Sequence, residues 1–270
     1  MSGPKVDYAK LREQEMASLA EARGRRLKVA DKIQKMINQI DSCLGGDVDL
    51  MLQDPQIGPS CKKIQELQAQ YKKELQALYN TVKHGTELLD VDAILHGGEV
   101  LLRRFGENTQ EEFDESTIKS ITRTDGLSDT WDRYGYMGGS NFADVPSTGK
   151  YTYSERAIPY VENEAAYHTG TFNNVTYFDK IDAIKNGDMD GLNTILSREG
   201  IVNVDSSYFK NLQNTYNDFI EDMANAVGSN IDATYGLKGT AASWGNMSGG
   251  AGQYVTPLNG STMKRLGIIN

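Results

Sequence analysis

Apolar residues recur at helical spacing through the first third of the chain. Between residues 7 and 44, and again from about 60 to 89, they fall three or four positions apart. The stripes consist of Val29, Ile33, Met36, Ile37, Ile40 and Leu44 in the first segment and Ile64, Leu67, Tyr71, Leu75, Leu78 and Val82 in the second. The pattern predicts two amphipathic helices, the first ended by Gly45 and Gly46, with residues 47–60 connecting them.

Two such helices joined by a short connector form an antiparallel hairpin. Each buried Leu or Ile stabilises the fold by about 1.5–3 kcal/mol. A lone hairpin buries apolar residues along only one seam, so few of its residues make this contribution. We therefore expect the hairpin to pack on further helix or on a partner. Residues 90–104 predict a third, short helix.

From residue 105 onward the helical period gives way to short extended segments, glycine-rich turns and aromatic clusters. Extended pieces are predicted at 151–160, 175–178 and 254–258, the last as an edge strand, with a strand or a helix start at 118–122. Helices are predicted at 205–228 and 261–266. The expected fold class is α+β: a helical hairpin followed by a small mixed domain with a short-stranded, mainly antiparallel sheet.

Charge and composition change at the same point in the chain. Residues 1–104 carry 16 Lys+Arg against 15 Asp+Glu, whereas residues 105–270 carry 12 against 22 and hold all 7 Phe, both Trp and 11 of the 14 Tyr. We predict a helical delivery or partner-binding region at 1–104, a linker at 105–116 and a second domain at 117–270. The acidic second domain argues against a nucleic-acid partner, because phosphate backbones bind basic surfaces.

Other sequence features exclude further classes of protein. No apolar run approaches the roughly 18–20 residues that span a bilayer, and the N-terminus has no apolar signal-peptide region. The two cysteines, Cys43 and Cys61, lie near facing ends of the predicted helices. Two interpretations fit them: a disulfide worth roughly 3 kcal/mol, or two free thiols in a reducing compartment.

The candidate chemistry lies in a few short segments of the second domain. Arg133 and Arg156 each stand beside aromatic and turn residues, and a guanidinium fork binds phosphate oxygens in two parallel bonds. The competing interpretation is that each arginine pairs with a nearby carboxylate such as Asp132 or Glu155. The stretch 248–252 is rich in glycine, which lets backbone approach a ligand closely, and it positions Gln253 at the start of a strand.

Five short motifs together resemble the tuberculosis necrotizing toxin family of NAD glycohydrolases. In order along the chain they are Asp132-Arg133-Tyr134-Gly135, the Gly138-Gly139 pair with Phe142, Arg156-Ala157-Ile158-Pro159, Tyr167-His168, and Gly249-Gly250-Ala251-Gly252-Gln253-Tyr254. The similarity covers roughly residues 127–180 and 236–270. It implies hydrolysis of NAD, and usually NADP, to nicotinamide and ADP-ribose without a metal, so that NAD is the substrate and no separate cofactor is needed.

The resemblance also implies roles for individual residues. Gln253, Arg133 and Arg156 match the catalytic and substrate-gripping positions, and the substrate pocket would include His168, Tyr134, Phe142, Gly252 and Tyr254. Phe142 stands where members of the family often carry tyrosine, which removes a hydroxyl from that position. The segment from Tyr177 to Lys238 is longer than in compact members, and a lid, an inhibitor-docking surface or filler would each account for it.

Two other classes of function remain open. An ADP-ribosyltransferase breaks the same bond, and Glu162-Asn163-Glu164 has the Glu-x-Glu spacing of an acceptor-activating pair. A helical adaptor with a non-catalytic binding domain is the alternative outside enzymes. By analogy with polymorphic toxins, the first interpretation implies a secreted virulence factor exported by a type VII-like route with a small helical partner. Such a toxin acts in the target-cell cytoplasm and is neutralised in its producer by an immunity protein.

Overall fold

The computed structural model of the protein describes residues 5–44, 48–55, 58–111, 113–158, 162–245 and 247–270. The chain separates into two compact units: Met1–Gln110 with Ile158–Val161, and Glu111–Ala157 with Glu162–Asn270. Predicted features at Gly45, Gly46 and Pro159 lie outside the described residues.

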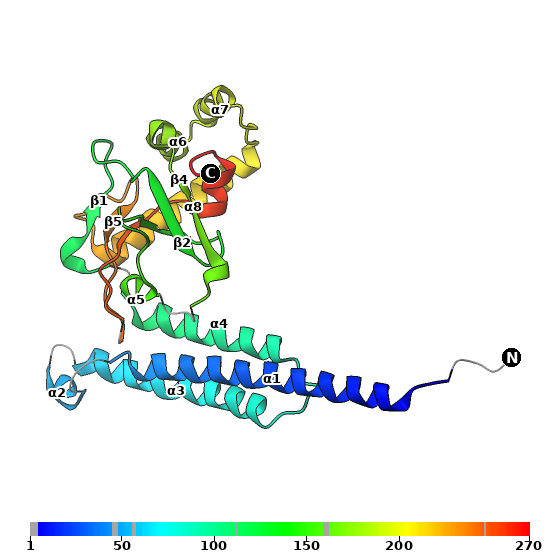
Figure 1. Ribbon diagram of the computed structural model, residues 1–270. Coiled ribbons are helices and arrows are strands. Elements are labelled where there is room, and N and C mark those ends of the chain that lie inside the picture. Colours follow the sequence, from blue (N-terminus) through cyan, green and yellow to red (C-terminus); the bar gives the residue numbers. More distant parts are fainter. Residues whose placement is uncertain (1–4, 45–47, 56–57, 112, 159–161, 246) are drawn as a thin grey trace. The chain divides into compact units, whose positions relative to one another are not determined.

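The first unit is built from helices (Figure 1). It contains α1 (Tyr8–Asp41), α2 (Val48–Gln53), α3 (Gly58–Lys83) and α4 (Val91–Thr109). The long helices α1, α3 and α4 pack against one another and bury the two predicted apolar stripes fully or in part. The fully buried centre consists of Ile33, Met36, Ile40, Leu75, Val82, Leu102 and Phe105. The third helix therefore supplies the additional seam that the hairpin needs, and it is longer than predicted.

Local sequence explains how α4 fits against its neighbours. The carboxylate of Asp90 caps its N-terminus by accepting a hydrogen bond from the backbone N–H of Ala93 at 3.1 Å. Gly98 lies where a Cβ atom would come within 3.2 Å of the sulfur of Met36, so its small size permits the close approach of α4 to α1. The predicted linker at 105–116 begins inside α4, and Phe105 is fully buried.

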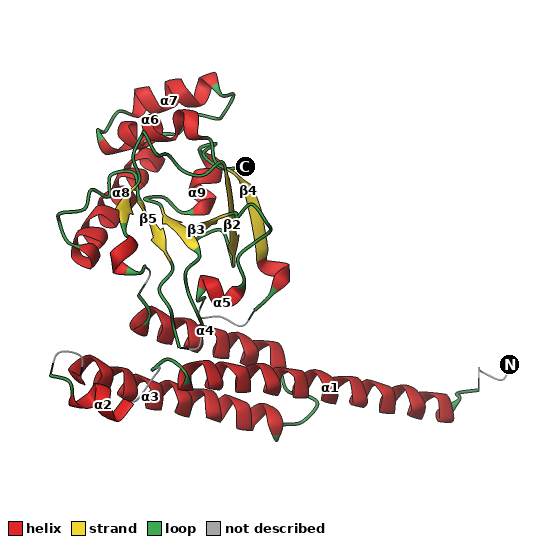
Figure 2. Cartoon of the chain, turned by 60° about the vertical axis from the view of Figure 1, so that its left-hand side comes forward, coloured by secondary structure: helices red, strands yellow, loops and turns green. Residues whose placement is uncertain are grey.

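The second unit contains a six-stranded sheet in its described part. The strands are β1 (Lys119–Ser120), β2 (Thr130–Tyr134), β3 (Asn141–Asp144), β4 (Tyr167–Thr171), β5 (Leu237–Thr240) and β6 (Gly252–Val255), in the spatial order β1-β5-β6-β3-β2-β4. Every described pairing is antiparallel. Figure 2 shows these short strands beside the helices of this unit, so the predicted α+β class is confirmed.

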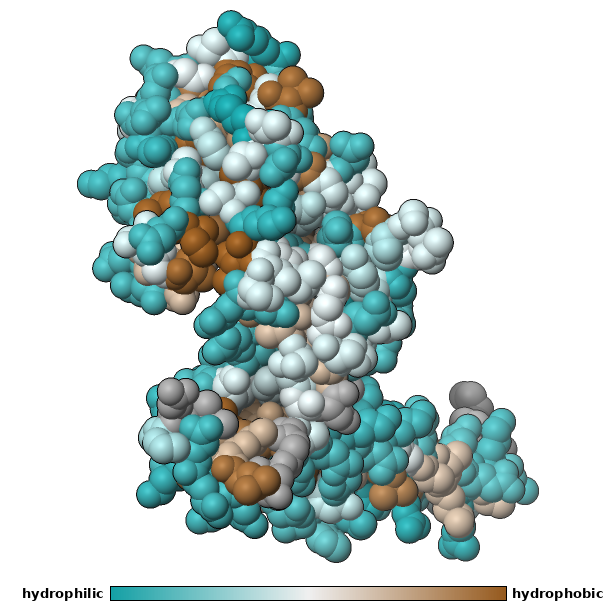
Figure 3. Space-filling model, turned by 90° about the vertical axis from the view of Figure 1, so that its left-hand side faces the viewer, coloured by the Kyte–Doolittle hydropathy of each residue, from teal (hydrophilic) through white to brown (hydrophobic). Residues whose placement is uncertain are grey.

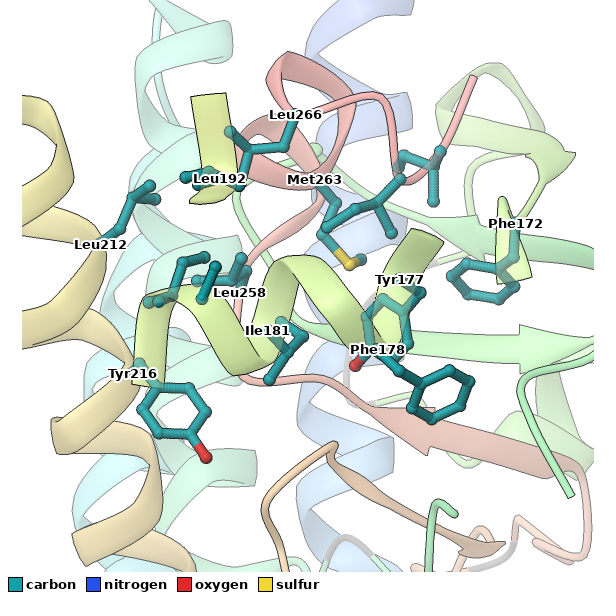
Figure 4. Close-up of a cluster of buried hydrophobic side chains, with 14 of the residues drawn as sticks. Phe172, Tyr177, Phe178, Ile181, Leu192, Leu212, Tyr216, Leu258, Met263 and Leu266 are labelled. Carbon is teal, nitrogen blue, oxygen red and sulfur yellow. The ribbon is translucent and has the colours of Figure 1, made fainter. Parts of the chain in front are cut away.

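Helices pack over one face of this sheet, which we call the helical face. They are α6 (Asn174–Lys185), α7 (Met189–Arg198), α9 (Gly260–Arg265) and the N-terminal half of α8 (Ser206–Val227). The C-terminal half of α8 packs on Leu237 and Val255, which point to the other face. On the helical face, the apolar side chains of the helices form one buried cluster with Trp131, Phe142 and Phe172 from the sheet and its margin. Figure 4 shows part of this cluster, including Phe172, Tyr177 and Met263. Because α6 and α8 supply so much of this core, the segment from Tyr177 to Lys238 is part of the fold rather than filler.

The structure corrects three local predictions and confirms two. Residues 175–178 are helical in α6, and residues 153–156 form the short helix α5 (Tyr153–Arg156) rather than extended chain. The strand after the glycine loop, β6, lies inside the sheet between β5 and β3 and not at its edge. The helices predicted at 205–228 and 261–266 are present as α8 and α9.

Cys43 and Cys61 are free thiols, and burial raises the pKa of the Cys43 thiol to about 11. The side of the molecule seen in Figure 3 is largely hydrophilic, with separate apolar patches. In the part of the chain that the structure describes, every helix is too short or too polar to cross a bilayer.

Candidate active site

The strand β2 distributes the residues of the first motif to the two faces of the sheet. Successive side chains of a strand point to opposite faces. Trp131 packs in the core of the helical face, so Arg133 shares that face, whereas Asp132 and Tyr134 point to the other side. Arg156 of α5 contacts Asp132 and Tyr134, and we therefore call this second side the α5 face.

The helix α5 is short but strongly specified by its first turn. Thr152 accepts a hydrogen bond from the N–H of Glu155, and Glu155 accepts one from the N–H of Thr152 at 3.0 Å, which completes a capping box. The bonds from Thr152 hold the pKa of Glu155 below its ordinary value. The helix ends at Ala157, whose φ of 48° is left-handed, a conformation that costs a non-glycine residue of the order of 1–3 kcal/mol.

Arg156 reaches from this helix to a buried carboxylate on β2. Its Nη1 lies 2.7 Å from Oδ1 of Asp132, and the two side chains are 5% and 0% exposed. The two atoms form an ion pair without the alignment of a hydrogen bond, and Nη2 of Arg156 is buried with no hydrogen-bond partner among the described residues. The arginine therefore keeps one buried donor that is unsatisfied in this structure, at a cost of about 1–3 kcal/mol.

Tyrosine rings surround this ion pair on the α5 face. The guanidinium of Arg156 lies 5.2 Å from the ring centroid of Tyr134, and the ring of Tyr134 contacts those of Tyr153 and Tyr167. The hydroxyl of Tyr167 donates to Oδ2 of Asp132 at 2.9 Å. A desolvated carboxylate is thus held by two partners, which fixes the position of the arginine.

A second charged pair continues the same cluster toward solvent. Lys150 donates to Glu164 at 2.5 Å, the hydroxyl of Tyr134 donates to the other carboxylate oxygen at 2.9 Å, and Lys150 lies 4.3 Å from the ring centroid of Tyr167. The bond from Lys150 holds the pKa of Glu164 below its ordinary value, and the bond to Glu164 raises the pKa of Lys150. Glu164 is therefore an ionised carboxylate at the margin of this cluster.

The glycine loop is fastened to α5 by backbone hydrogen bonds. The N–H of Gly249 donates to the carbonyl of Ser154, and the N–H of Ala251 donates to the carbonyl of Glu155, both at 3.0 Å. Gly249 and Gly250 have φ of 67° and 94°, values that favour glycine. The loop and the arginine helix thus form one local structure, although they are far apart in sequence.

Gln253 follows this loop on β6 and points to the α5 face. Its register partner on β3 is Ala143, and the register partner of Ala143 on β2 is Asp132. Directly paired residues of adjacent strands share a face, so Gln253 lies in the same cross-strand row as the carboxylate that binds Arg156. The structure therefore places Arg156, Tyr134 and Gln253 of the predicted site on one face of the sheet.

Arg133 and His168 lie on the opposite, helical face. The guanidinium of Arg133 lies 5.3 Å from the ring centroid of Phe142 and covers Gly139, and its Nη1 donates to the carbonyl of Asn141 at 3.1 Å. His168 is the direct register partner of Arg133 on β4. The two arginines are thus separated by the sheet and do not form one clamp in this structure.

The remaining predicted pocket residues also belong to the helical face. Phe142 is 1% exposed and packs edge to face on Trp131 at 5.3 Å, which makes it a core residue. Tyr254 is the register partner of Phe142, and its hydroxyl accepts a hydrogen bond from the N–H of Ser128 at 3.1 Å. Gly252 lies against the carboxylate of Asp144, where a Cβ atom would clash.

Sequence reasoning missed two features of the α5 face. The Thr-x-x-Glu signature at 152–155 predicts a helix start, and it would have placed Arg156 at a helix end and assigned Glu155 to the cap. Nothing in the spacing of the chain indicates that Asp132 pairs with Arg156 or that Tyr153 joins the cluster, because these contacts depend on tertiary packing. Comparison with models of protein families, with curated proteins and with solved structures gives no match.

The α5 face offers a particular set of interactions to a ligand. It contains a guanidinium with an unsatisfied, buried donor, a group of tyrosine rings, the carboxamide of Gln253 and the glycine loop. Such a set suits a molecule that has anionic oxygens, an aromatic ring and hydroxyl groups.

Proposed function

We propose that the second unit is an NAD glycohydrolase and that the α5 face binds the dinucleotide. The observation that carries this proposal is the attachment of the glycine loop to α5, which joins the Arg156 and Gln253 motifs on one face of the sheet. The order of the five motifs, which resembles that of the necrotizing toxin family, supports the same function. Residues on the helical face, including Arg133 and Phe142, then support the fold rather than the reaction.

The chemistry assigns a task to each group on the α5 face. Arg156 binds a diphosphate oxygen through Nη2, a buried donor that substrate binding has to uncover, and the tyrosine rings pack on the planar parts of the substrate. The glycosidic bond between ribose and nicotinamide breaks with its electron pair moving to the cationic ring, so the leaving group requires no general acid. Positive charge develops on the ribose, as in glycoside hydrolysis. Gln253 orients the ribose or the attacking water, whose proton passes to solvent after the new bond forms.

The test is to mix purified protein with NAD and measure nicotinamide and ADP-ribose. The Gln253→Ala variant should lose turnover by about 100-fold or more, because one positioned polar group commonly contributes that much. Gln213→Ala, which removes an equivalent amide from α8, serves as the matched control and should retain full activity. Equal activity of the two variants, with both folded by circular dichroism, would reject the role of Gln253.

The same assay separates the hydrolase from a transferase. Glu164 belongs to the Glu162-Asn163-Glu164 segment and accepts a hydrogen bond from Tyr134, which itself contacts Arg156. This contact gives the transferase a carboxylate at the margin of the proposed site. Radiolabel appearing on protein would favour transfer, free ADP-ribose favours hydrolysis, and no turnover would favour a non-catalytic binding domain.

We further propose that the first unit binds a helical partner during export. The buried stripe of α1 continues toward its N-terminus through Tyr8, Leu11 and Leu19, which are 77%, 51% and 47% exposed. This face is available to another amphipathic helix. The double variant Leu11→Glu with Leu19→Glu should abolish export from the producing bacterium, whereas Glu13→Gln, off the stripe on the same helix, should not. Export of the double variant at the normal level would contradict this proposal.

On this proposal the protein is a secreted toxin that depletes NAD, or NADP, in the cytoplasm of a target cell. The producing cell then requires an immunity protein that occupies the dinucleotide site. Expression of the second unit alone in a bacterial cytoplasm should lower cellular NAD and stop growth, and the Gln253→Ala variant should do neither.

A further inference from the structure

Along its inner side, strand β4 forms backbone hydrogen bonds with β2. The N–H of Phe172 donates to the carbonyl of Asp129 at 3.0 Å, and the carbonyl of Ala166 accepts from the N–H of Gly135 at 2.9 Å. Both are even-numbered residues of the β4 segment and its flanks. Backbone groups of an antiparallel strand point alternately to its two sides, so the odd-numbered residues point outward, away from β2.

The outward side is covered only in part. The N–H of Thr171 donates to Oδ1 of Asn270 at 2.8 Å, and the N–H of Asn173 donates to the carbonyl of Ile268 at 2.7 Å. The segment 268–270 thus runs antiparallel along the outer side of residues 171–173. Thr169, two residues before Thr171, directs its N–H and C=O the same way. It is exposed, and no described strand lies beyond it, because β4 is the last strand of the sheet (Figure 2).

A cavity opens beside this uncovered edge. It has a volume of about 290 Å³ and is lined by Trp131, Met137, Tyr167, His168, Thr169, Lys264 and Asn270. Trp131 and Met137 give it apolar walls, while Lys264 on α9 and the imidazole of His168 provide its basic side chains. Among the described residues, no Asp or Glu lines the cavity. Its charge therefore complements an acidic side chain.

We propose that the open edge of β4 at Thr169 is a docking site for an extended segment of a protein partner. The segment adds as a further strand in line with residues 268–270, and it exchanges backbone hydrogen bonds with Thr169. Side chains of the added strand alternate between the two faces, so one of them enters the cavity. A glutamate or aspartate there meets Lys264. Backbone bonds provide affinity and the cavity provides selectivity, as in other cases of strand addition.

This site does not depend on the proposed reaction. The cavity is lined by Trp131 and His168 from the helical face, and it shares Tyr167 with the α5 face, where Gln253 and Arg156 lie. Lys264 belongs to α9, on the helical face, so loss of partner binding through Lys264 and loss of NAD hydrolysis are separable by mutation.

The experiment uses the full chain, labelled with ¹⁵N, and a capped peptide of sequence Thr-Val-Glu-Val-Thr. Two further peptides serve as controls, one with Lys in place of Glu and one with methylated backbone nitrogens. The Glu peptide should shift the amide resonance of Thr169 and slow its hydrogen exchange. The Lys peptide should bind about tenfold more weakly, a difference of about 1.4 kcal/mol, and the methylated peptide should not bind.

Variants of the protein test the same two elements. Thr169→Pro removes the outward N–H, and it should abolish peptide binding, whereas Thr169→Ala should retain it. Both variants lose the bond that the hydroxyl of Thr169 donates to the carbonyl of Trp131 on β2, so the alanine variant is the control for that loss. Lys264→Glu should reverse the preference between the Glu and Lys peptides. Lys185→Glu, the same charge change in the last turn of α6, should leave the preference unchanged.

Three results would overturn the proposal. The first is the absence of any change at Thr169 with the Glu peptide at millimolar concentration. The second is unaltered binding to a folded Thr169→Pro variant, which would show that strand addition does not occur. The third is equal affinity for the Glu and Lys peptides, which would show that the cavity does not select an acidic side chain.

Discussion

At the scale of single residues, Asp132 is the group on which the α5 face depends. It is fully buried, it pairs with Arg156, and it accepts the hydroxyl of Tyr167. The Asp132→Asn substitution keeps the shape but leaves the buried guanidinium without its counter-charge. We expect a loss of about 3–5 kcal/mol of unfolding free energy in urea titrations, the usual cost of removing one partner of a buried pair.

The exposed pair of Lys150 and Glu164 is the matched control for this prediction. Its atoms are as close, at 2.5 Å, but water screens both charges. Glu164→Gln should therefore shift the urea midpoint far less than Asp132→Asn. Equal shifts would mean that burial does not determine the strength of these pairs and that Asp132 has no special part in the fold.

The two arginines should behave differently in enzyme kinetics. Arg156→Lys keeps a charge for Asp132 but loses the planar fork, so the KM for NAD should rise while the protein stays folded. Arg133 packs on Phe142, on the opposite face of the sheet from Arg156, so Arg133→Lys should leave KM unchanged. Steady-state kinetics on both variants checks this. A rise in KM for Arg133→Lys alone would restore the prediction, made from the motifs, that this arginine binds the diphosphate.

At the scale of elements, the glycine loop joins the helix α5 to the strand β6. Gly249 and Gly250 both have positive φ, but their surroundings differ. A Cβ atom on Gly249 would lie 2.6 Å from the carbonyl oxygen of Ala241, whereas nothing lies within 4 Å of one on Gly250. Gly250→Ala should cost about 1–3 kcal/mol through backbone strain alone. Gly249→Ala should cost more and detach the loop from α5.

Thermal unfolding of the two variants, measured beside NAD turnover, tests this difference. Turnover should fall further for Gly249→Ala, because Gln253 follows directly on the displaced loop. Identical melting temperatures would show that the loop adapts to the added methyl group and that its attachment to α5 is loose.

Acid should loosen the link between α6 and the residue that follows α7. Lys180 is fully buried and donates to Glu199 at 2.5 Å, and Thr176 and Asn173 donate to the same carboxylate. Burial raises the pKa of Glu199, but these bonds outweigh it and hold that pKa below its ordinary value of 4.5.

A carboxyl whose pKa is lowered by folding stabilises the protein above its unfolded pKa, and the contribution disappears as the pH falls through the folded pKa. Glu199→Gln should therefore show a flatter loss of stability below about pH 4.5 than the unmodified protein. Glu221→Gln, on the exposed side of α8, should follow the unmodified curve. Urea midpoints measured across this range provide the comparison, and a profile for Glu199→Gln as steep as the original would contradict the assignment.

Helices were predicted best where apolar residues at helical spacing continued over many residues. The stripes of α1, α3 and α8 each repeat over several turns, and these helices lie where they were expected. Residues 175–178 were wrongly predicted to be extended, because their β-branched and aromatic side chains favour strands. In the fold, Tyr177, Ile181 and Ile184 bury a helical stripe that a four-residue window does not reveal.

The candidate site was predictable only in part, for a different reason. Motif order indicated Arg156 and Gln253, and both lie on the α5 face. The motifs did not indicate on which face of a strand a side chain lies. Asp132 and Arg133 are adjacent in sequence, and the alternation of β2 sends one to each side of the sheet. Pairing of Arg156 with Asp132 rather than Glu155 likewise depends on tertiary packing.

At the scale of the whole molecule, the two units have separate cores. The apolar clusters of the second unit draw all their members from residues 113–269, and the helical core consists of α1, α3 and α4. A fragment spanning residues 111–270 should therefore fold without the helical unit and hydrolyse NAD at the rate of the full chain.

Scanning calorimetry of this fragment should show one cooperative transition, within a few degrees of the corresponding transition in the full chain. A loss of 1 kcal/mol of stability shifts the melting temperature of such a domain by only about 2–4 °C. A fragment of residues 1–110 should show a transition of its own. If the 111–270 fragment lacks a cooperative transition while the full chain shows one, the helical unit is required for the fold of the second unit.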